Sequence, residues 1–287
     1  MNHRKLVATK NNEKNAIKFL IKNGYIPSKK NCATCYDTPC RLTVKKQKYV
    51  WQCSKCTNCT SIYKGTVYYK SKLKITKLLD LIYFWSIDLK QKNARYEIET
   101  KSRQTTTTWY KNLRNLSQEM AFELNDQKIG GVGHIVEIDE SLFSRRKYSV
   151  GRLTMKKWVV GGIDTTNGKS FFVETFSRNK ESLNQIILNH VEKGTTIYTD
   201  EWKGYADLES LGYIHLTVNH SKNFINPQIG ANTQRIECEW GILKRKLRER
   251  GITCRENLLL FFMEFCVKRH YGEFFFAILM RRLANIN

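Results

Sequence analysis

Apolar residues recur at two different spacings along the chain, and the change of spacing divides it into regions. From residue 70 to about 128, Leu, Ile and aromatic residues stand three or four positions apart, which predicts helices. From about residue 134, short apolar runs separated by turn residues predict strands. After a loop that contains Pro227 and Gly230, the helical spacing returns and continues through the amphipathic tail.

The strand-rich part predicts a mixed sheet flanked by helices, an α/β fold. The expected elements are the strands HIVEID and KKWVVGGID, a DTTNG turn, the strand KSFFVETF, the helix NKESLNQIILNHV, and the strands TTIYTD and YIHLTV. We divide the chain into a helical and basic segment at 1–30, a cysteine-rich module at 31–69, a helical segment at 70–128 and a catalytic region with C-terminal helices at 129–287.

The net charge indicates what the protein binds. The chain carries 49 Lys and Arg against 26 Asp and Glu, a formal charge of +23. Residues 1–130 hold 26 of the cations and 9 of the acids, a net of +17, so the positive charge is concentrated in the first half. An excess of this size argues against small neutral substrates and favours a polyanion such as DNA.

Membrane and secreted classes do not fit the sequence. The longest apolar runs, LLLFFMEFCV and FFFAILM, are too short for a span, and Glu264 interrupts the first. The opening MNHRKLVATKNNEKN lacks an apolar core followed by small residues, so it does not resemble a secretory signal. We expect a nuclear protein if the host is eukaryotic, otherwise a cytoplasmic protein associated with the nucleoid.

Six of the nine cysteines lie between residues 32 and 59 in a metal-ligand pattern. Two CxxC pairs are separated by 17 residues; their members are Cys32, Cys35, Cys53 and Cys56. Each pair can direct two thiolates at one tetrahedral ion, and the spacer is long enough for a hairpin that brings the pairs together. Four thiolates favour Zn²⁺, which predicts a zinc ribbon whose folding depends on the ion. The alternative is a set of unbound buried cysteines.

The segment KNARYEIETKSRQTTTTWYKNLRNLSQEM predicts a short helix, a polar break and a second helix. We expect the second helix to present cations and hydrogen-bonding side chains on one exposed face, as a DNA major groove requires. Its candidate contacts are Arg103, Gln104, Thr105, Thr106, Thr107, Thr108, Lys111 and Arg114. A plain helical hairpin linking two domains explains the same residues equally well.

Three acidic residues stand where a mixed sheet can gather them. Asp139 ends the HIVEID run and Asp200 ends the TTIYTD run, so both carboxylates are expected to emerge at strand ends. Glu237 lies near the start of the next predicted helix. The buried stripe of that helix is Ile236, Trp240, Leu243 and Leu247. Each acid also has a structural interpretation, the aspartates as turn caps and Glu237 as a surface charge.

A cationic run follows Glu237 in the same helix. Lys244 and Arg248 stand seven and eleven residues after Glu237. Gly241, between Glu237 and Lys244, leaves space beside the carboxylate. Three carboxylates can hold two Mg²⁺ or Mn²⁺ ions, which activate a water or a 3′-hydroxyl and neutralise charge on a phosphodiester. The cations behind them would hold the DNA backbone. Asp164, in GGIDTTNG, is better explained as a turn residue than as a further ligand.

Neighbouring residues leave the ligand assignment open. Glu137, Glu140 and Glu201 adjoin the proposed acids and are alternative partners. His220 is polar and near the expected cleft, but a structural histidine explains it as well.

Several stretches in a fixed order resemble one family of DNA-transposing enzymes. They are WQCSKCTNC, SIYKGT, VEIDESLFSRRKYSVGR, WVVGGID, TIYTDEWKGYADL, VNHSKNF and GANTQRIECEWGILKRKLR. Together they span about residues 30 to 280 and resemble the Merlin transposases and their bacterial insertion-sequence relatives with an ISXO-type catalytic domain.

This resemblance implies a ribonuclease-H-like catalytic domain, preceded by a zinc ribbon, with a DDE triad at Asp139, Asp200 and Glu237. It implies cut-and-paste transposition, in which metal-dependent hydrolysis at the transposon end is followed by strand transfer into target DNA. Terminal inverted repeats, target DNA and at least one further copy of the chain are the implied partners. Lys244 matches a recurrent basic residue of the relatives, whereas Asn232 stands where they commonly have histidine.

Two other functions remain compatible with the sequence. A transposase-derived protein can bind DNA without cutting it, and a structure-selective nuclease can cut without joining. The sequence assigns no role to Asn232, Cys40 or Cys59.

Overall fold

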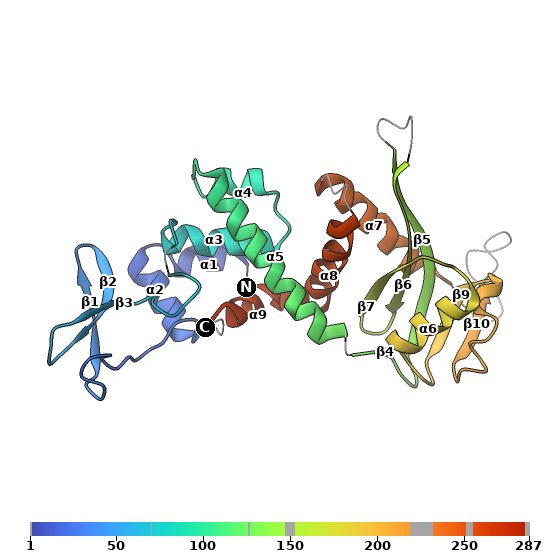
Figure 1. The fold of residues 1–287 in the computed structure, drawn as a ribbon, viewed down its shortest axis with the longest axis horizontal. Coiled ribbons are helices and arrows are strands. Elements are labelled where there is room, and N and C mark those ends of the chain that lie inside the picture. Colours follow the sequence, from blue (N-terminus) through green and yellow to red (C-terminus); the bar gives the residue numbers. More distant parts are fainter. Residues whose placement is uncertain are drawn as a thin grey trace. The chain divides into compact units, whose positions relative to one another are not determined.

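The computed structural model describes residues 2–69, 71–125, 127–146, 153–218, 232–250 and 255–284. The chain divides into two compact units, residues 1–113 together with 273–287, and residues 114–272. Figure 1 shows a small antiparallel sheet and helices in the first unit and the large sheet in the second. Within the described ranges, no helix combines the length and apolar character needed to cross a membrane.

The first unit opens with two short helices and a three-stranded ribbon. The helices are α1 (His3–Thr9) and α2 (Glu13–Lys22). The strands are β1 (Cys40–Lys45), β2 (Lys48–Cys53) and β3 (Cys59–Ser61), which pair antiparallel in that order. The Asn12 side chain caps α2 by accepting from the Asn15 N–H, and Gly24 follows the helix with a positive φ of 71°. The predicted helix and hairpin are both confirmed.

Three helices follow, as the apolar spacing predicts. They are α3 (Ile75–Ser86), α4 (Gln91–Glu97) and α5 (Arg103–Asn125). The last helix, α9 (Phe275–Ala284), packs on α3 in the same unit, with the Tyr83 and Phe276 rings 5.4 Å apart and the Trp85 and Phe275 rings 5.8 Å apart. The sequence placed α9 with the catalytic region, but its aromatic face is buried in the first unit.

The second unit is built on a five-stranded mixed sheet. Its strands are β5 (Ile135–Arg146), β6 (Leu153–Asp164), β7 (Ser170–Thr175), β9 (Thr196–Asp200) and β10 (Ile214–Val218), and β4 (Ile129–Gly130) pairs separately with β8 (Val191–Glu192). The order across the sheet is β10-β9-β5-β6-β7. Strand β5 is central. On one side of it, β6 and then β7 pair antiparallel, and on the other side β9 and then β10 pair parallel. This is the ribonuclease-H-like arrangement.

Helices cover both faces of the sheet. One face carries α6 (Lys180–His190), and the other carries α7 (Gln234–Arg250) and α8 (Arg255–Tyr271); the short 3-10 helices are η2 (Lys203–Tyr205) and η3 (Gly272–Phe274). The core on the α6 side includes Val136, Ile138, Val160, Leu183, Ile187 and Ile197. The core on the α7 side includes Phe143, Phe172, Ile236, Trp240, Leu243, Leu247 and Phe262. The predicted stripe of α7 is therefore buried as expected.

Two glycines in β6 let aromatic rings approach the sheet closely. A Cβ on Gly161 would lie 2.5 Å from the Trp240 ring, and one on Gly162 would lie 2.3 Å from the Phe171 ring. Because consecutive strand residues face opposite sides, each glycine makes room on a different face. The Trp240 ring thus reaches the centre of the sheet.

Strand β5 is longer than the sequence suggests. HIVEID was expected to end a strand at Asp139, but β5 continues to Arg146 because its pairing with β6 extends through Arg146 and Leu153. Asp139 therefore lies inside the central strand, opposite Gly161, and not at a strand end. The expectation for β9 is confirmed, since that strand ends at Asp200.

Candidate active site

Asp139 is held by the aromatic core beneath it. Its Oδ2 accepts a hydrogen bond of 2.9 Å from the Trp240 indole N–H. The Trp240 ring fits there because residue 161, the cross-strand neighbour of Asp139, has no side chain. The same tryptophan therefore packs the core and fixes the orientation of the Asp139 carboxylate.

Asp200 is oriented by the turn that follows β9. Its Oδ1 accepts the backbone N–H of Trp202 at 3.0 Å, a local side-chain-to-backbone bond that favours a turn. Because β9 pairs parallel with β5, the carboxyl end of β9 lies beside the middle of the longer central strand. Asp200 and Asp139 are thereby brought to one region.

Glu237 lies in the first turn of α7, and Glu137 of β5 anchors that turn. The Glu137 Oε2 accepts the backbone N–H groups of Arg235 and Ile236 at 2.8 and 3.0 Å. These N–H groups lack helical partners, so a buried carboxylate satisfies them and the helix dipole together. The Thr233 hydroxyl donates to the Glu237 Oε1 at 3.2 Å.

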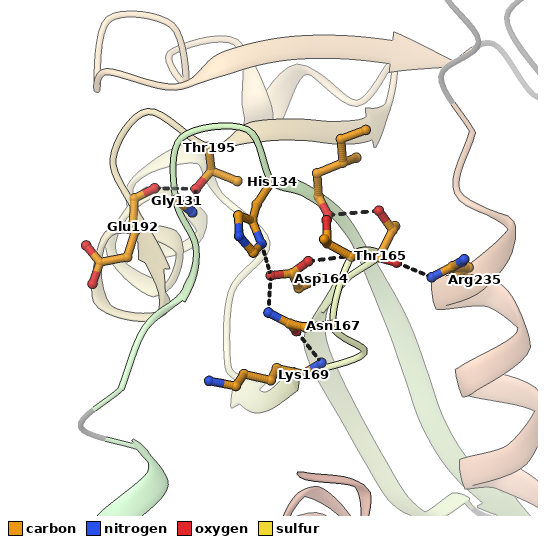
Figure 2. Close-up of polar contacts among 11 residues, drawn as sticks. Gly131, His134, Asp164, Thr165, Asn167, Lys169, Glu192, Thr195 and Arg235 are labelled. Carbon is orange, nitrogen blue, oxygen red and sulfur yellow. Dashed lines mark hydrogen bonds and ion pairs between the residues drawn. The ribbon is translucent and has the colours of Figure 1, made fainter.

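A polar network at the β6–β7 turn holds α7 at a second point (Figure 2). The Arg235 guanidinium donates to the Thr165 carbonyl, and Thr165 in turn donates from its N–H to the Ile135 carbonyl at 2.9 Å. Asp164, fully buried, accepts from the Thr166 N–H and the Asn167 amide. These bonds tie the start of α7 to β5 and β6.

The interpretation of Asp164 as a turn residue is confirmed. Besides its bonds within the turn, its Oδ2 lies 2.8 Å from the His134 Nδ1. Burial alone would raise the pKa of Asp164, but the Thr166 N–H and His134 together hold it below its usual value. Its carboxylate is fully engaged in the scaffold shown in Figure 2.

The other two proposed acids disfavour the negative charge of Asp139. Burial raises the pKa of Asp139, hydrogen bonds from the Glu140 N–H and Trp240 oppose this, and the carboxylates of Asp200 and Glu237 raise it further. Both carboxylates therefore disfavour the ionised form of Asp139. A cluster of like charges of this kind is stabilised by a bound cation.

Lys244 and Arg248 extend from the same side of α7. Burial lowers the pKa of Lys244, the negative charge of Asp139 counteracts this, and Arg248 adds to the lowering. The Lys244 ammonium lies 5.5 Å from the centre of the Phe143 ring. Lys244 is thus half-buried and interacts electrostatically with Asp139, whereas Arg248 is exposed.

The carboxylates fit divalent cations, although they are not drawn tightly together. In the described ranges, the four ribbon cysteines form a group whose ligand atoms all lie within 4.8 Å of one another, and the three acids do not form such a group. In a two-ion site, Asp139, Asp200 and Glu237 would together hold the ions, so that no single ion would need all three carboxylates, and the ions would stabilise the attacking and leaving oxygens of a phosphodiester. Hard oxygen donors suit Mg²⁺ or Mn²⁺.

The alternative acids have other roles. Glu137 caps α7, as described above, and Glu140 points to the opposite face of β5 from Asp139. Burial raises the pKa of Glu140 to about 7, and the Arg178 guanidinium, 3.7 Å away, partly opposes this. Glu201 is exposed, and His220 lies outside the described residues.

The predicted metal group of the ribbon is confirmed in its geometry. The thiols of Cys32, Cys35, Cys53 and Cys56 come together at the base of the hairpin and can hold one metal ion. The backbone N–H groups of Cys35 and Thr34 point at the Cys32 Sγ and lower its pKa to about 6, which favours a thiolate. Cys40 and Cys59 lie outside this group of four.

The predicted groove-reading face of α5 is only partly exposed. Arg103 and Lys111 are exposed, but Thr106 is fully buried and donates to the Arg103 carbonyl. The Arg114 Nε lies 3.5 Å from the buried Glu264 carboxylate, an ion pair that the sequence did not reveal. The expectation of one continuous exposed face is therefore wrong at Thr106, and Arg114 has a structural partner.

The sequence named Glu137 only as an alternative ligand and did not reveal that it caps α7, although strand alternation does place Glu137 and Asp139 on one face. The contacts of Trp240 with Asp139 and of Arg178 with Glu140 join residues that are distant in sequence, and no local spacing points to them.

Fold and site together define a ribonuclease-H-like domain with a group of carboxylates beside cations. Residues 129–256 match the family model of the ISXO2-like transposase domain. The match covers less than half of the chain's length and shows what this region is similar to. The resemblance noted in the sequence is thereby confirmed over these residues.

Solved structures with some similarity are retroviral. A chain of the simian T-cell lymphotropic virus intasome in complex with PP2A regulatory subunit B56 gamma has a TM-score of 0.33 and 18% identity over 49% of this chain and 50% of that chain. The catalytic core domain of HTLV-2 integrase with magnesium, in its dimeric form, has a TM-score of 0.31 and 16% identity over 47% and 87%. The trimeric form scores 0.30 with 15% identity over 50% and 86%.

This chain spans half the length of the first of these structures. Similarity at this level carries no weight for the chemistry of this chain. No curated protein matches it.

Proposed function

We propose that the protein is a DNA transposase, which hydrolyses a phosphodiester at the transposon end with divalent metal ions and transfers the freed 3′-hydroxyl into target DNA. The observation that supports the proposal is the match of residues 129–256 to the ISXO2-like transposase domain, together with the hydrogen bonds that hold the start of α7, where Glu237 lies, against the strand of Asp139. Cut-and-paste transposition requires both ends of the element, so we also propose that the chain works as a dimer or larger assembly.

In this proposal, Asp139, Asp200 and Glu237 would together hold two Mg²⁺ or Mn²⁺ ions, with Asp139 on the central strand of the sheet. The bound ions would activate the attacking hydroxyl and neutralise charge on the phosphate. Lys244, whose charge Asp139 favours, would hold the phosphate backbone, and the exposed Arg248 would bind it farther along the helix. Trp240 and Glu137 keep the ligands in place without touching the DNA.

The ribbon and the α4–α5 helices are proposed to bind DNA before the acids cut it. Four soft thiolate ligands favour Zn²⁺. Because the ribbon has little core of its own, the ion would supply much of its folding energy. Lys45, Lys46 and Lys48 are exposed at its hairpin, and Arg103 and Lys111 are exposed on α5. Phosphate contacts by such cations give binding without demanding a base sequence.

A strand-cleavage assay tests the proposal. The substrate is a set of DNA duplexes taken from the sequence flanking the gene, incubated with the full chain and Mg²⁺ or Mn²⁺. We expect nicking at one position and joining to a second duplex. Asp139→Asn, Asp200→Asn and Glu237→Gln should each lose more than about 100-fold in rate, a larger loss than an outer-shell substitution causes, with DNA binding retained.

Glu249→Gln is the matched control, because Glu249 is an exposed acid of the same helix as Glu237. Its cleavage rate should equal that of the unaltered chain. Full activity in Asp139→Asn would refute the site. Binding of the duplexes without cleavage by the unaltered chain would favour a non-catalytic DNA-binding protein, and cleavage without joining would indicate a nuclease.

A further inference from the structure

Arg178 lies between two tryptophan rings near Asp200. Its guanidinium carbon is 4.1 Å from the centre of the Trp158 ring and 4.9 Å from the centre of the Trp202 ring. Trp158 belongs to β6, and Trp202 stands two residues beyond Asp200. A planar cation stacked on two indole rings is held far more firmly than a surface arginine.

Hydrogen bonds connect this stack to the Asp200 carboxylate. The Trp202 backbone N–H donates to the Asp200 Oδ1 at 3.0 Å, and the Trp202 indole N–H points at the Arg178 carbonyl at 3.5 Å. The turn after β9 and the loop before α6 are therefore fastened to each other at Trp202. Any movement of that residue changes the donor that orients Asp200.

The stack also reaches the strand that carries Asp139. An Arg178 Nη2 lies 3.7 Å from the Oε2 of the buried Glu140, which directly follows Asp139. Contacts thus run from Glu140 through Arg178 and Trp202 to Asp200. The backbone positions of the two aspartates are coupled through side chains on the face of the sheet opposite α7.

The geometry of this ion pair is poor for a purely stabilising contact. The Arg178 Nε is buried without a hydrogen-bond partner among the described residues, whereas Glu140 interacts with the Tyr205 hydroxyl as well as with Arg178. Unsatisfied buried atoms of this kind cost stability. Trp202 is 45% exposed, so burial does not fix it and its stacking on Arg178 does.

We propose that Arg178 is a positioning residue for the metal site. By stacking between Trp158 and Trp202 it fixes the position of the Trp202 backbone N–H, and this N–H orients the Asp200 carboxylate. The inference rests on the proposed function in one respect, namely that Asp139 and Asp200 bind ions together. Lysine cannot replace arginine here, because an ammonium group has no flat faces to stack between two indoles.

Binding of Mn²⁺ to the full chain, followed by electron paramagnetic resonance without DNA, tests this proposal. Arg178→Lys and Trp202→Ala should each weaken Mn²⁺ binding roughly 10-fold, the lower range for loss of an outer-shell partner. Trp202→Ala is included because the residue is half exposed, so its loss leaves the core intact. Thermal unfolding of each variant is recorded alongside.

Lys180→Gln is the control, since Lys180 is a nearby cation of α6 that pairs with Asp207 and takes no part in the stack. Its Mn²⁺ affinity should not change. Unchanged affinity in Trp202→Ala overturns the inference and leaves the proposed function standing. If the unaltered chain binds no Mn²⁺, or Asp139→Asn binds it equally well, the proposed metal site fails and this inference fails with it.

Discussion

The Trp240 side chain links the aromatic core to the carboxylate proposed to bind metal. Its ring packs edge-on against Phe143 and Phe172, with centroids 5.9 and 5.2 Å away, and its N–H bonds Asp139. Gly161 gives it the space to do both. At the scale of single residues, core packing and the orientation of Asp139 therefore depend on the same side chain. A substitution that keeps an aromatic ring but removes the N–H separates the two effects.

Trp240→Phe should keep the fold and impair the proposed reaction. The smaller ring still fills the site over Gly161, but Asp139 loses a donor that lowers its pKa. A hydrogen bond to a charged group is worth about 1.5 to 3 kcal/mol, so we expect cleavage at least about 10-fold slower at pH 7 with near-native secondary structure. Cleavage rates and circular dichroism measure the two effects.

Gly161→Ala approaches the same contact from the other side. An added Cβ would lie 2.5 Å from the Trp240 ring, so the indole must shift and the bond to Asp139 should weaken. Cleavage equal to that of the unaltered chain in both variants would show that this hydrogen bond does not orient Asp139.

Single-residue prediction from the sequence worked where a local pattern carried the signal. Asp164 in its turn and the thiols in their CxxC pairs were recognisable because turn chemistry and ligand spacing are local. The cap that Glu137 places on α7 joins residues 98 and 99 positions apart, which no periodicity encodes. Hence the sequence indicated which acids to consider but not which of them are structural.

At the scale of elements, α7 and α8 are joined by buried acids as well as by apolar side chains. Glu239 of α7 pairs with Arg269 of α8, and Glu264 of α8 pairs with Arg250 of α7 through two bonds of 3.0 Å. Lys268 contributes a further contact to Glu264 at 2.7 Å. The acid that interrupts an apolar run in the sequence thus fastens two helices together.

The stability of the second unit should fall in acid because of Glu264. Burial alone would raise its pKa, but Lys268 and Arg250 hold it at about 2 in place of the usual 4.5. Because the folded pKa is depressed, the contribution is complete above about pH 4.5 and is lost as the pH falls toward 2. The shift corresponds to about 3 kcal/mol at neutral pH.

Urea unfolding at pH 7, 5 and 3 measures this contribution. Glu264→Gln should lower the free energy of unfolding at pH 7 by about 3 to 5 kcal/mol, because buried cations lose their partner, and should flatten the acid dependence. Glu249→Gln, an exposed acid on α7, should do neither. An acid profile unchanged by Glu264→Gln would contradict the assignment.

Element prediction followed the same division between local and distant information. The buried stripe of α7 was readable because Ile236, Leu243 and their neighbours repeat at helical spacing. The length of β5 was not, since its end depends on pairing with β6. The place of α9 was missed because an amphipathic helix does not specify which partner covers its apolar face.

At the scale of the whole molecule, the excess of positive charge is the property that DNA binding would use. Most of it lies in the first 130 residues, which carry the ribbon and the α4–α5 helices. The structure separates cations that are exposed from those that serve the fold. Lys111 and Arg114, three residues apart on α5, are one of each kind, and they give a matched pair of substitutions.

Binding of the full chain to a DNA duplex should weaken steeply with salt. A protein that neutralises on the order of 6 to 10 phosphates loses roughly a thousandfold or more in affinity between about 50 and 200 mM salt. Lys111→Gln should reduce the slope of log affinity against log salt by about 0.9, because one phosphate contact disappears. Arg114→Gln also removes one positive charge, but this arginine is a partner of Glu264. The substitution should therefore lower the urea midpoint and leave the salt slope unchanged. Fluorescence anisotropy over a salt series distinguishes these results.

A flat salt dependence in the unaltered chain would remove the argument for DNA. Equal slopes in both variants and the unaltered chain would show that the phosphate contacts lie elsewhere, and the ribbon lysines would be the next residues to substitute.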